Sequence, residues 1–242
     1  MKLGIGVNLF KRQEQKGTPI RDGLVAEYLF NEGRGQVLCD YSGNGNHGTL
    51  GSTRDADTND PLWTPQGLQF DGVDDYVDCG NSKTLQITQD LTMQLAVYIP
   101  ADIASTSFFM SKRYNGEYEI GYLADNGLAY RHQWAGSAVT LNFINFFDVL
   151  GKNYTVAVTR DTSSKIVTAY KSGIEFSALT YPGEPGASNN NLYLGARSGG
   201  EHFTLASIYC AFIYNRCLSP AEILENDDYI KILLAKRGVT LA

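Results

Sequence analysis

Two glutamates on one predicted strand come closest to a hydrolytic pattern in this sequence. Glu117 and Glu119 flank Tyr118, so an extended backbone places both carboxyl groups on the same side of the strand. Glycoside hydrolysis uses a pair of carboxyl groups that face each other across a cleft. Two acids on one strand do not by themselves meet that requirement, and we interpret them as part of an exposed strand edge.

Other catalytic patterns are missing from the sequence. The three histidines, His47, His132 and His202, stand in unrelated contexts, and no G-x-S-x-G elbow occurs. The sequence also contains neither a Walker phosphate loop nor a dinucleotide-binding fingerprint. We therefore predict that the protein is not an enzyme, and a glycoside hydrolase is the least favoured alternative.

Composition restricts the class of protein further. The 242 residues are 43% hydrophobic and include 15 Tyr and 11 Phe, which is enough for a packed core and excludes intrinsic disorder. The net charge of -6 offers no basic field for nucleic acid. No apolar run is long enough to span a bilayer, and the first residues do not form a signal-peptide pattern. The four cysteines lack C-x-x-C pairing and are expected to be reduced thiols.

The elements that would position these residues are mostly short strands. Alternating or β-branched runs recur between Asn, Gly and Asp turn signals, from residues 24–30 to residues 208–214. Residues 154–159 and 166–170 flank a polar turn and predict a hairpin. No linker or fixed-period repeat divides the chain. The pattern predicts one all-β domain over residues 23–218, an antiparallel two-sheet jelly-roll sandwich.

Both ends of the chain depart from this pattern. Residues 1–22 form an N-terminal arm, and residues 219–242 form a short C-terminal helical extension that begins with the capping pattern Ser219, Pro220 and Glu222. Terminal pieces of this kind fray unless something holds them. We therefore expect neighbouring subunits to hold them. The predicted assembly contacts are Leu9, Phe10, Ile230 and Leu233.

Several segments of the sequence, in order, resemble the laminin-G-like, concanavalin-A-like jelly-roll family. They cover most of the chain and imply the fold. The family hosts lectin modules, adhesion domains, enzyme appendages and virion proteins, so the resemblance does not select one function. The matching parts are residues 23–30 (G-L-V-A-E-Y-L-F), 40–48 (D-Y-S-G-N-G-N-H-G), 68–77 (L-Q-F-D-G-V-D-D-Y-V), 154–159 (Y-T-V-A-V-T), and the closing segments 192–196 (L-Y-L-G-A) and 213–223 (I-Y-N-R-C-L-S-P-A-E-I).

Two of these motifs also have a folding interpretation. Phe70 and Tyr76 are expected to fill the core on either side of a tight turn at residues 71–72. Asn44 and Asn46 are expected to supply the bends of the loop at residues 40–48.

The resemblance implies a structural Ca²⁺ near one sheet edge, held by loop carboxylates and carbonyls. The family's closing strand usually carries an acidic pair, but Tyr209 and Cys210 stand at that place here, which removes an anionic ligand. Turn-capping or solvated aspartates are the competing interpretation. The candidate calcium ligands are Asp40, Asp71, Asp74 and Asp75.

Sugar binding is the commonest use that the resemblance implies. Lectin sites stack aromatic rings on sugar rings and bind hydroxyl groups with Asn, Asp and Arg. The competing interpretation is that the aromatic residues fill the sandwich. The candidate glycan-binding residues, all in strand-end or loop contexts, are Tyr114, Asn115, Tyr130, His132, Trp134 and Arg197.

These observations predict a non-enzymatic structural or display protein of a large assembly. A bacteriophage virion component fits best: a capsid decoration, head-fibre or tail protein that docks onto capsid or tail proteins through its extensions and exposes a lectin-like sandwich to glycans. Such a protein is made in the host cytoplasm, binds no nucleic acid and inserts into no membrane. The alternative is a free carbohydrate-binding module or adhesin, extracellular or on a cell surface, with calcium as an optional cofactor.

Overall fold

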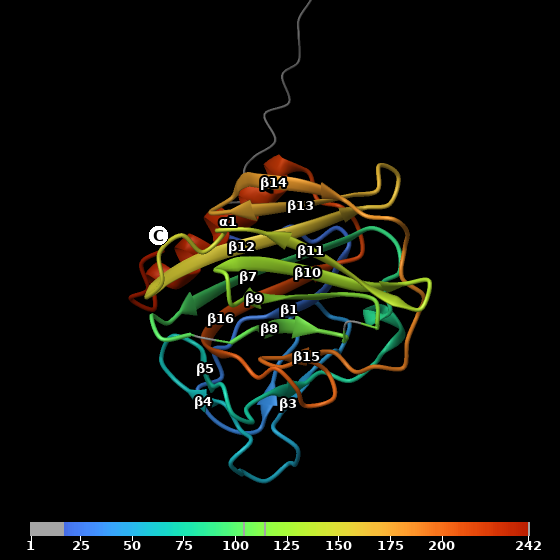
Figure 1. Ribbon diagram of the computed structural model, residues 1–242. Helices are drawn as coiled ribbons and strands as arrows, with labels where there is room; N and C mark the ends of the chain where they lie inside the picture. Colours follow the sequence, from blue (N-terminus) through green and yellow to red (C-terminus); the bar gives the residue numbers. More distant parts are fainter. Residues whose placement is uncertain (1–16, 104, 114, 242) are drawn as a thin grey trace, which may run out of the picture.

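Two antiparallel sheets pack face to face in the computed structural model, which describes residues 17–103, 105–113 and 115–241 (Figure 1). In the first sheet the strand order is β14-β13-β12-β7-β16-β5-β4, and β1 also pairs with β16. In the second sheet the order is β11-β10-β9-β8-β15-β6-β3-β2. This arrangement confirms the predicted two-sheet jelly-roll sandwich.

Strands overlap the runs predicted at residues 24–30, 154–159, 166–170 and 208–214, and further strands, such as the one at residues 174–180, lie outside the predicted runs. The strands of the first sheet are β1 (Leu24–Tyr28), β4 (Leu62–Trp63), β5 (Leu68–Asp71), β7 (Leu91–Ile99), β12 (Lys152–Asp161), β13 (Ile166–Lys171), β14 (Ile174–Thr180) and β16 (Leu205–Tyr214). The strands of the second sheet are β2 (Val37–Leu38), β3 (Gly48–Leu50), β6 (Val77–Asp78), β8 (Ser107–Ser111), β9 (Glu119–Leu123), β10 (Gly127–Trp134), β11 (Ser137–Phe143) and β15 (Tyr193–Leu194). The helices are the short 3-10 helix η1 (Lys83–Leu85) and α1 (Pro220–Ala235).

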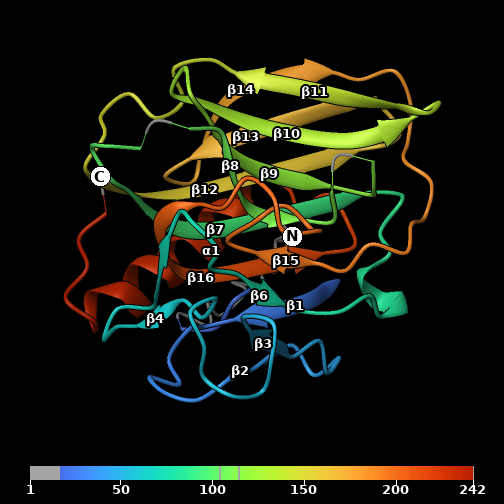
Figure 2. The ribbon, with the colours of Figure 1, turned by 60° about the horizontal axis from the view of Figure 1, so that its bottom comes forward.

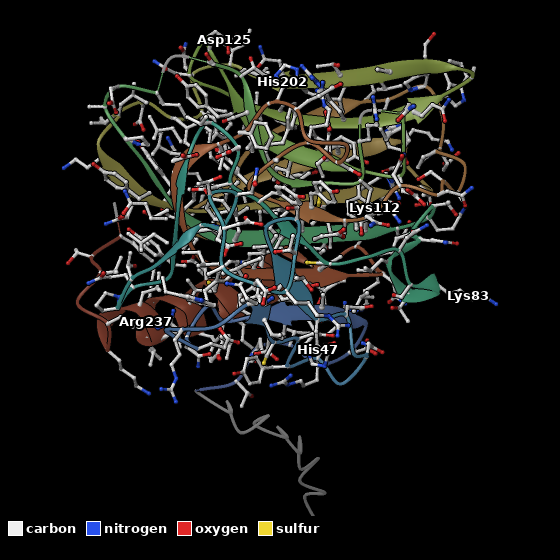
Figure 3. All side chains as sticks on the ribbon, turned by 90° about the horizontal axis from the view of Figure 1, so that it is seen from below. His47, Lys83, Lys112, Asp125, His202 and Arg237 are labelled. Carbon is white, nitrogen blue, oxygen red and sulfur yellow. The ribbon has the colours of Figure 1, made fainter. Side chains whose placement is uncertain are left out.

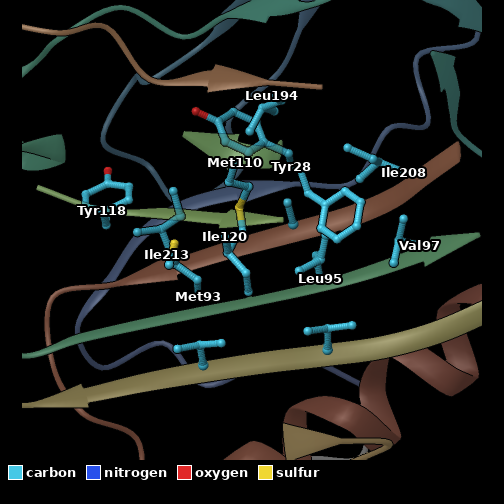
Figure 4. Close-up of a cluster of buried hydrophobic side chains, with 14 of the residues drawn as sticks. Tyr28, Met93, Leu95, Val97, Met110, Tyr118, Ile120, Leu194, Ile208 and Ile213 are labelled. Carbon is cyan, nitrogen blue, oxygen red and sulfur yellow. The ribbon is translucent and has the colours of Figure 1, made fainter. Parts of the chain in front are cut away.

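The main core lies between the two sheets, where alternate residues of the long strands meet (Figure 4). On β7, Leu95 and Val97 point into this core, whereas Ala96 belongs to a second apolar cluster on the outer side of the first sheet. The same alternation places Ile213 of β16 inside the sandwich and Phe212 outside it. The first sheet is therefore covered on both of its faces, and most residues of its central strands β7, β12 and β16 are buried.

Helix α1 covers the outer face of the first sheet (Figure 2). It begins as predicted: the Ser219 side chain accepts from the Glu222 backbone N–H, and the Glu222 side chain accepts from the Ser219 backbone N–H, which completes a capping box. It ends before Gly238, whose φ of 73° is a conformation that glycine adopts without strain. None of the described helices is long and apolar enough to cross a membrane.

The packing of α1 corrects one assembly prediction. Ile230 is fully buried against the first sheet of its own chain, so its side chain is not available to a neighbouring subunit. Leu233 is half-buried in the same cluster. Leu9 and Phe10 lie outside the described residues.

Two further predictions are confirmed by the local structure. Strands β12 and β13 pair as a hairpin from Val156 opposite Lys171 to Asp161 opposite Ile166. All four cysteines are free thiols.

Burial raises the pKa of both Cys79 and Cys210 to about 12, which keeps these two thiols protonated and unreactive near neutral pH.

The loop at residues 40–48 bends at its glycines rather than at its asparagines, which corrects that prediction. Gly43 and Gly45 adopt φ values of 93° and 74°. Asn44 and Asn46 instead donate side-chain N–H groups to the Val25 carbonyl, at 3.0 and 2.9 Å. The asparagines therefore fasten the loop to β1.

Candidate functional site

Two of the predicted glycan-binding residues lie inside the sandwich, so their placement corrects the prediction. Tyr130 is fully buried, and its hydroxyl accepts a hydrogen bond from Arg160 Nη1 at 2.8 Å. His132 is also fully buried, with Nε2 2.8 Å from the Gly183 carbonyl oxygen. Neither ring presents a face to solvent, and neither can stack on a sugar.

Arg197 has a structural contact that was not foreseen. Its guanidinium is buried, lies over the Phe108 ring at 4.6 Å from the centroid, and pairs with Glu119 at 3.1 Å from Nη2 to Oε1. Trp134 and Asn115 are exposed, and they lie in neighbouring segments because the Gln133 N–H donates to the Gly116 carbonyl. Tyr114 lies outside the described residues. The five predicted residues that the structure describes therefore do not form one site.

The glutamates that resembled a hydrolytic pair are buried rather than exposed, which corrects their interpretation as a strand edge. Glu117 Oε1 lies 3.5 Å from Lys112 Nζ. Glu119 pairs with Arg197, and its Oε2 accepts from Ser111 Oγ at 2.8 Å. Both carboxylates are enclosed by their partners, so they do not face each other across an open cleft as hydrolysis requires.

An open cavity of about 440 Å³ lies where β3 and β6 meet the loop after β3. Tyr76 forms its aromatic wall, and the Tyr76 ring is stacked on Tyr193 with 4.7 Å between the centroids and 14° between the planes. The partner ring fixes the orientation of Tyr76, so the wall is preorganised. The residues that line the cavity are His47, Thr49, Gly51, Ser52, Thr53, Arg54, Tyr76, Asp78, Cys79 and Gly80.

Polar groups of this cavity are held in defined orientations. His47 Nδ1 accepts the Asp40 N–H at 3.0 Å, so the neutral imidazole carries its proton on Nε2 and keeps that N–H as a donor. The Asp78 carboxylate accepts the Asn191 side-chain amide at 3.0 Å on both oxygens. Register pairing of β3 with β6 sets Thr49 opposite Asp78. The cavity therefore combines an aromatic face with fixed donors and acceptors. Figure 3 shows His47 on the side of the molecule near β3.

Two sequence motifs contain residues of this cavity, but in the sequence we interpret both motifs as folding elements. His47 belongs to the loop motif at residues 40–48, and Tyr76 belongs to the motif at residues 68–77. The prediction that Phe70 fills the core is confirmed, but Tyr76 is half-buried outside it, which corrects the prediction for Tyr76. Arg54, which is exposed in the loop after β3, carried no recognisable pattern.

The predicted calcium ligands divide into two groups. Asp40 has both oxygens engaged, because Oδ1 accepts the Glu27 N–H at 3.0 Å and Oδ2 accepts the Asn46 N–H at 2.9 Å. Asp71, Asp74 and Asp75 gather within 4.8 Å of one another, which suits hard-oxygen coordination. Exposed acidic groups also cluster without a metal, so this arrangement alone assigns no calcium. Asp40 therefore acts as a loop-folding residue and is separate from the cluster.

Within that cluster Asp75 is electrostatically distinct. Burial raises the pKa of Asp75 to about 6, and the neighbouring Asp71 and Asp74 carboxylates act in the same direction. The Asp71 N–H, which donates to Asp75 Oδ2 at 2.8 Å, opposes the increase.

Comparison with known proteins identifies relatives of the fold. The family model described as the concanavalin A-like lectin/glucanases superfamily matches residues 71–224. Among solved structures, the binding domain of Paraclostridial Mosquitocidal Protein 1 is 14% identical, with a TM-score of 0.64 over 86% of this chain and 52% of that one. The ligand-binding domain of botulinum neurotoxin serotype D, in complex with N-acetylneuraminic acid, is 13% identical, with a TM-score of 0.65 over 86% of this chain and 51% of that one.

A third structure is botulinum neurotoxin type C, whose cell entry depends on interaction with two ganglioside molecules. It is 14% identical, with a TM-score of 0.65 over 90% of this chain and 52% of that one. The chain thus spans about half the length of these structures. A search of curated proteins gave no match. At these identities, the likeness to solved structures concerns the fold.

Proposed function

Because the chain belongs to the concanavalin A-like lectin/glucanases superfamily, we propose that it is a non-catalytic carbohydrate-binding domain with its ligand in the cavity beside Tyr76. The observation that carries this proposal is the stacked Tyr76–Tyr193 pair at the wall of a polar cavity. A sugar ring presents C–H groups on one face and hydroxyls around its rim. A fixed aromatic face beside fixed donors and acceptors matches both features.

The other large hollow fits a sugar less well. It measures about 510 Å³ and lies between α1 and the β12–β13 hairpin. Its aromatic residue, Tyr170, is buried, so no ring face is free for stacking. The cavity beside Tyr76 is therefore the better candidate.

Solved relatives support a carbohydrate ligand only in general terms. The serotype D domain is in complex with N-acetylneuraminic acid, and the type C toxin interacts with gangliosides. The non-catalytic part of the proposal is supported by the buried, ion-paired state of Glu117 and Glu119.

A glycan array followed by calorimetry tests this proposal with Tyr76→Ala. Loss of the stacking wall should weaken binding about tenfold, which corresponds to about 1.4 kcal/mol. Tyr41→Ala is the matched control, because Tyr41 is an exposed tyrosine outside the cavity lining. Unchanged affinity in Tyr76→Ala, or equal losses in both variants, would refute this placement of the ligand.

We further propose that the domain is displayed on a larger assembly, of which a bacteriophage virion is the favoured case. The root of the N-terminal arm supports this geometry: the Ile20 N–H donates to Asn226 Oδ1 at 2.8 Å, and Tyr214 Oη donates to the Ile20 carbonyl at 3.1 Å. These contacts hold the arm's root on the outer face of the first sheet, whereas the cavity belongs to the second sheet. Removal of residues 1–16 should abolish co-purification with the assembly and leave glycan binding intact. Assembly that survives this truncation would refute docking by the arm.

A further inference from the structure

Three side chains with complementary chemistry meet at one end of the second sheet. Lys112 Nζ donates to Asn81 Oδ1 and lies 3.5 Å from Glu117 Oε1. The side chains of Lys112 and Glu117 are both completely buried. The amine therefore lies against a half-buried side-chain amide, and both the amine and the neighbouring carboxylate are shielded from solvent. In Figure 3, by contrast, Lys83 projects outward from η1.

A single serine aligns the acid and the amide. The Ser188 N–H donates to Glu117 Oε1 at 2.9 Å, and Ser188 Oγ donates to Glu117 Oε2 at 2.7 Å. The Ser188 carbonyl accepts from Asn81 Nδ2 at 3.2 Å. The orientation of the Asn81 amide is thereby fixed, with its oxygen toward Lys112 and its nitrogen toward Ser188.

Each reacting segment is held by the fold. Lys112 directly follows β8, and its backbone N–H donates to the Tyr118 carbonyl at 2.8 Å. Asn81 follows β6, where the Cys79 N–H and the Gly80 carbonyl are both bonded to Leu192 at 2.8 Å. Little reorganisation therefore separates this arrangement from one in which the amine attacks the amide carbon.

We propose that Lys112 and Asn81 form an intramolecular isopeptide bond, with Glu117 as the group that transfers the proton. Neutral Lys112 Nζ attacks Asn81 Cγ, a new N–C bond forms, and the C–Nδ2 bond breaks. Glu117 takes a proton from the attacking nitrogen and delivers it to Nδ2, which leaves as ammonia. The atoms balance without any oxidant or second reactant.

The environment favours the neutral amine that this step needs. Burial lowers the pKa of Lys112, and the Glu117 carboxylate opposes that decrease. A desolvated lysine next to a proton acceptor is a better nucleophile than a solvated one. In a purely structural ion pair, Asn81 would remain a hydrogen-bond partner and its amide would stay intact.

The bond would tie the segment after β6 covalently to the end of β8. Gly80, the neighbour of Asn81, lines the cavity beside Tyr76, so the crosslink would also fix one wall of that cavity. The crosslink itself does not depend on the proposed carbohydrate function, and its test involves no glycan.

Intact-mass spectrometry of the purified full-length chain tests the proposal. We expect a mass about 17 Da below the value calculated from the sequence, which is the loss of one ammonia. A tryptic digest should contain one branched peptide that joins Asn81 to Lys112. A wild-type mass equal to the calculated one, after prolonged incubation, would overturn the proposal.

Variants separate this bond from other losses of ammonia. Lys112→Arg should restore the full mass. Glu117→Gln should fold and lack the branched peptide, because its amide oxygen can accept the Ser188 N–H and its amide N–H can donate to Ser188 Oγ. Lys83→Arg, an exposed lysine two residues from Asn81, should retain the loss. Succinimide formation at the Asn-Gly pairs also removes ammonia, so a loss that persists in Lys112→Arg would count against the isopeptide.

Discussion

Acid should destabilise this domain through His132, whose imidazole is fully buried. The Gly183 carbonyl can only accept, so the neutral ring donates from Nε2, and Nδ1 has no hydrogen-bond partner among the residues that the structure describes. Burial lowers the pKa of His132 to about 4, and the Arg160 guanidinium contributes in the same direction. Protonation of the His132 imidazole therefore costs free energy in the folded state but not in the unfolded state.

The size of this acid destabilisation follows from the difference between the His132 pKa values of the folded and unfolded states. An unfolded histidine has a pKa of about 6.5, so between about pH 6.5 and pH 4 the unfolded chain binds a proton that the folded chain does not. The stabilisation from neutral His132 is fully present above about pH 6.5, decreases as the pH falls, and reaches its limit near pH 4. The pKa difference corresponds to a loss of about 3 kcal/mol in the free energy of unfolding.

Urea unfolding of wild type and His132→Gln between about pH 7.5 and pH 4 measures this effect. Glutamine retains an N–H donor for the Gly183 carbonyl and does not titrate, so the variant should lose less stability in acid than wild type, by about 3 kcal/mol. His202→Gln, at an exposed histidine, is the matched control and should follow wild type. Asp75 also titrates in this pH range, but its contribution to the free energy of unfolding is the same in wild type and in His132→Gln, so it does not affect their difference. Equal pH dependence in wild type and His132→Gln would refute the reasoning.

Two predictions concern the acidic cluster. Because burial raises the pKa of Asp75 to about 6, its ionised form destabilises the fold at pH 7.5. Asp75→Asn should therefore gain about 3 kcal/mol at that pH in urea unfolding, a gain that disappears below about pH 4. A loss of stability in Asp75→Asn at pH 7.5 would contradict this account. Chelation of calcium should leave the melting temperature of wild type unchanged, because Asp71 Oδ1 and Asp75 Oδ2 already accept backbone N–H groups at 2.8 Å. A calcium-dependent increase that Asp75→Asn abolishes would instead establish a metal site.

The strand pattern and the helix cap were predictable because they depend on neighbouring residues. Alternation along 154–159 and the turn that follows it specify a hairpin locally. The capping box needs only Ser219 and Glu222, which are three positions apart. Strand alternation likewise predicts that Tyr130 and His132, two positions apart, lie on the same face of a strand. These local rules did not indicate whether that side faces the other sheet or the solvent, since this depends on how the sheets pack.

The cavity was not predictable for a related reason. Thr49 and Asp78 are brought together by the pairing of β3 with β6, and Tyr193 reaches Tyr76 because β15 pairs with β6 on its other side. Such non-local pairings place residues from three distant segments on one surface. A single sequence contains the residue types for this site but does not specify the register that assembles them.

The segments that flank β15 explain why the acidic residues and the cavity differ in accessibility. Ser188, before β15, covers Glu117, and Arg197, after β15, covers Glu119. The chain itself therefore closes the polar surface near β8 and β9, and satisfies its charges internally. At β3 and β6 no comparable segment among the described residues covers Tyr76 and His47, which leaves their ring face and N–H group accessible. A ligand that needs both stacking and hydrogen bonds would find them at this second location.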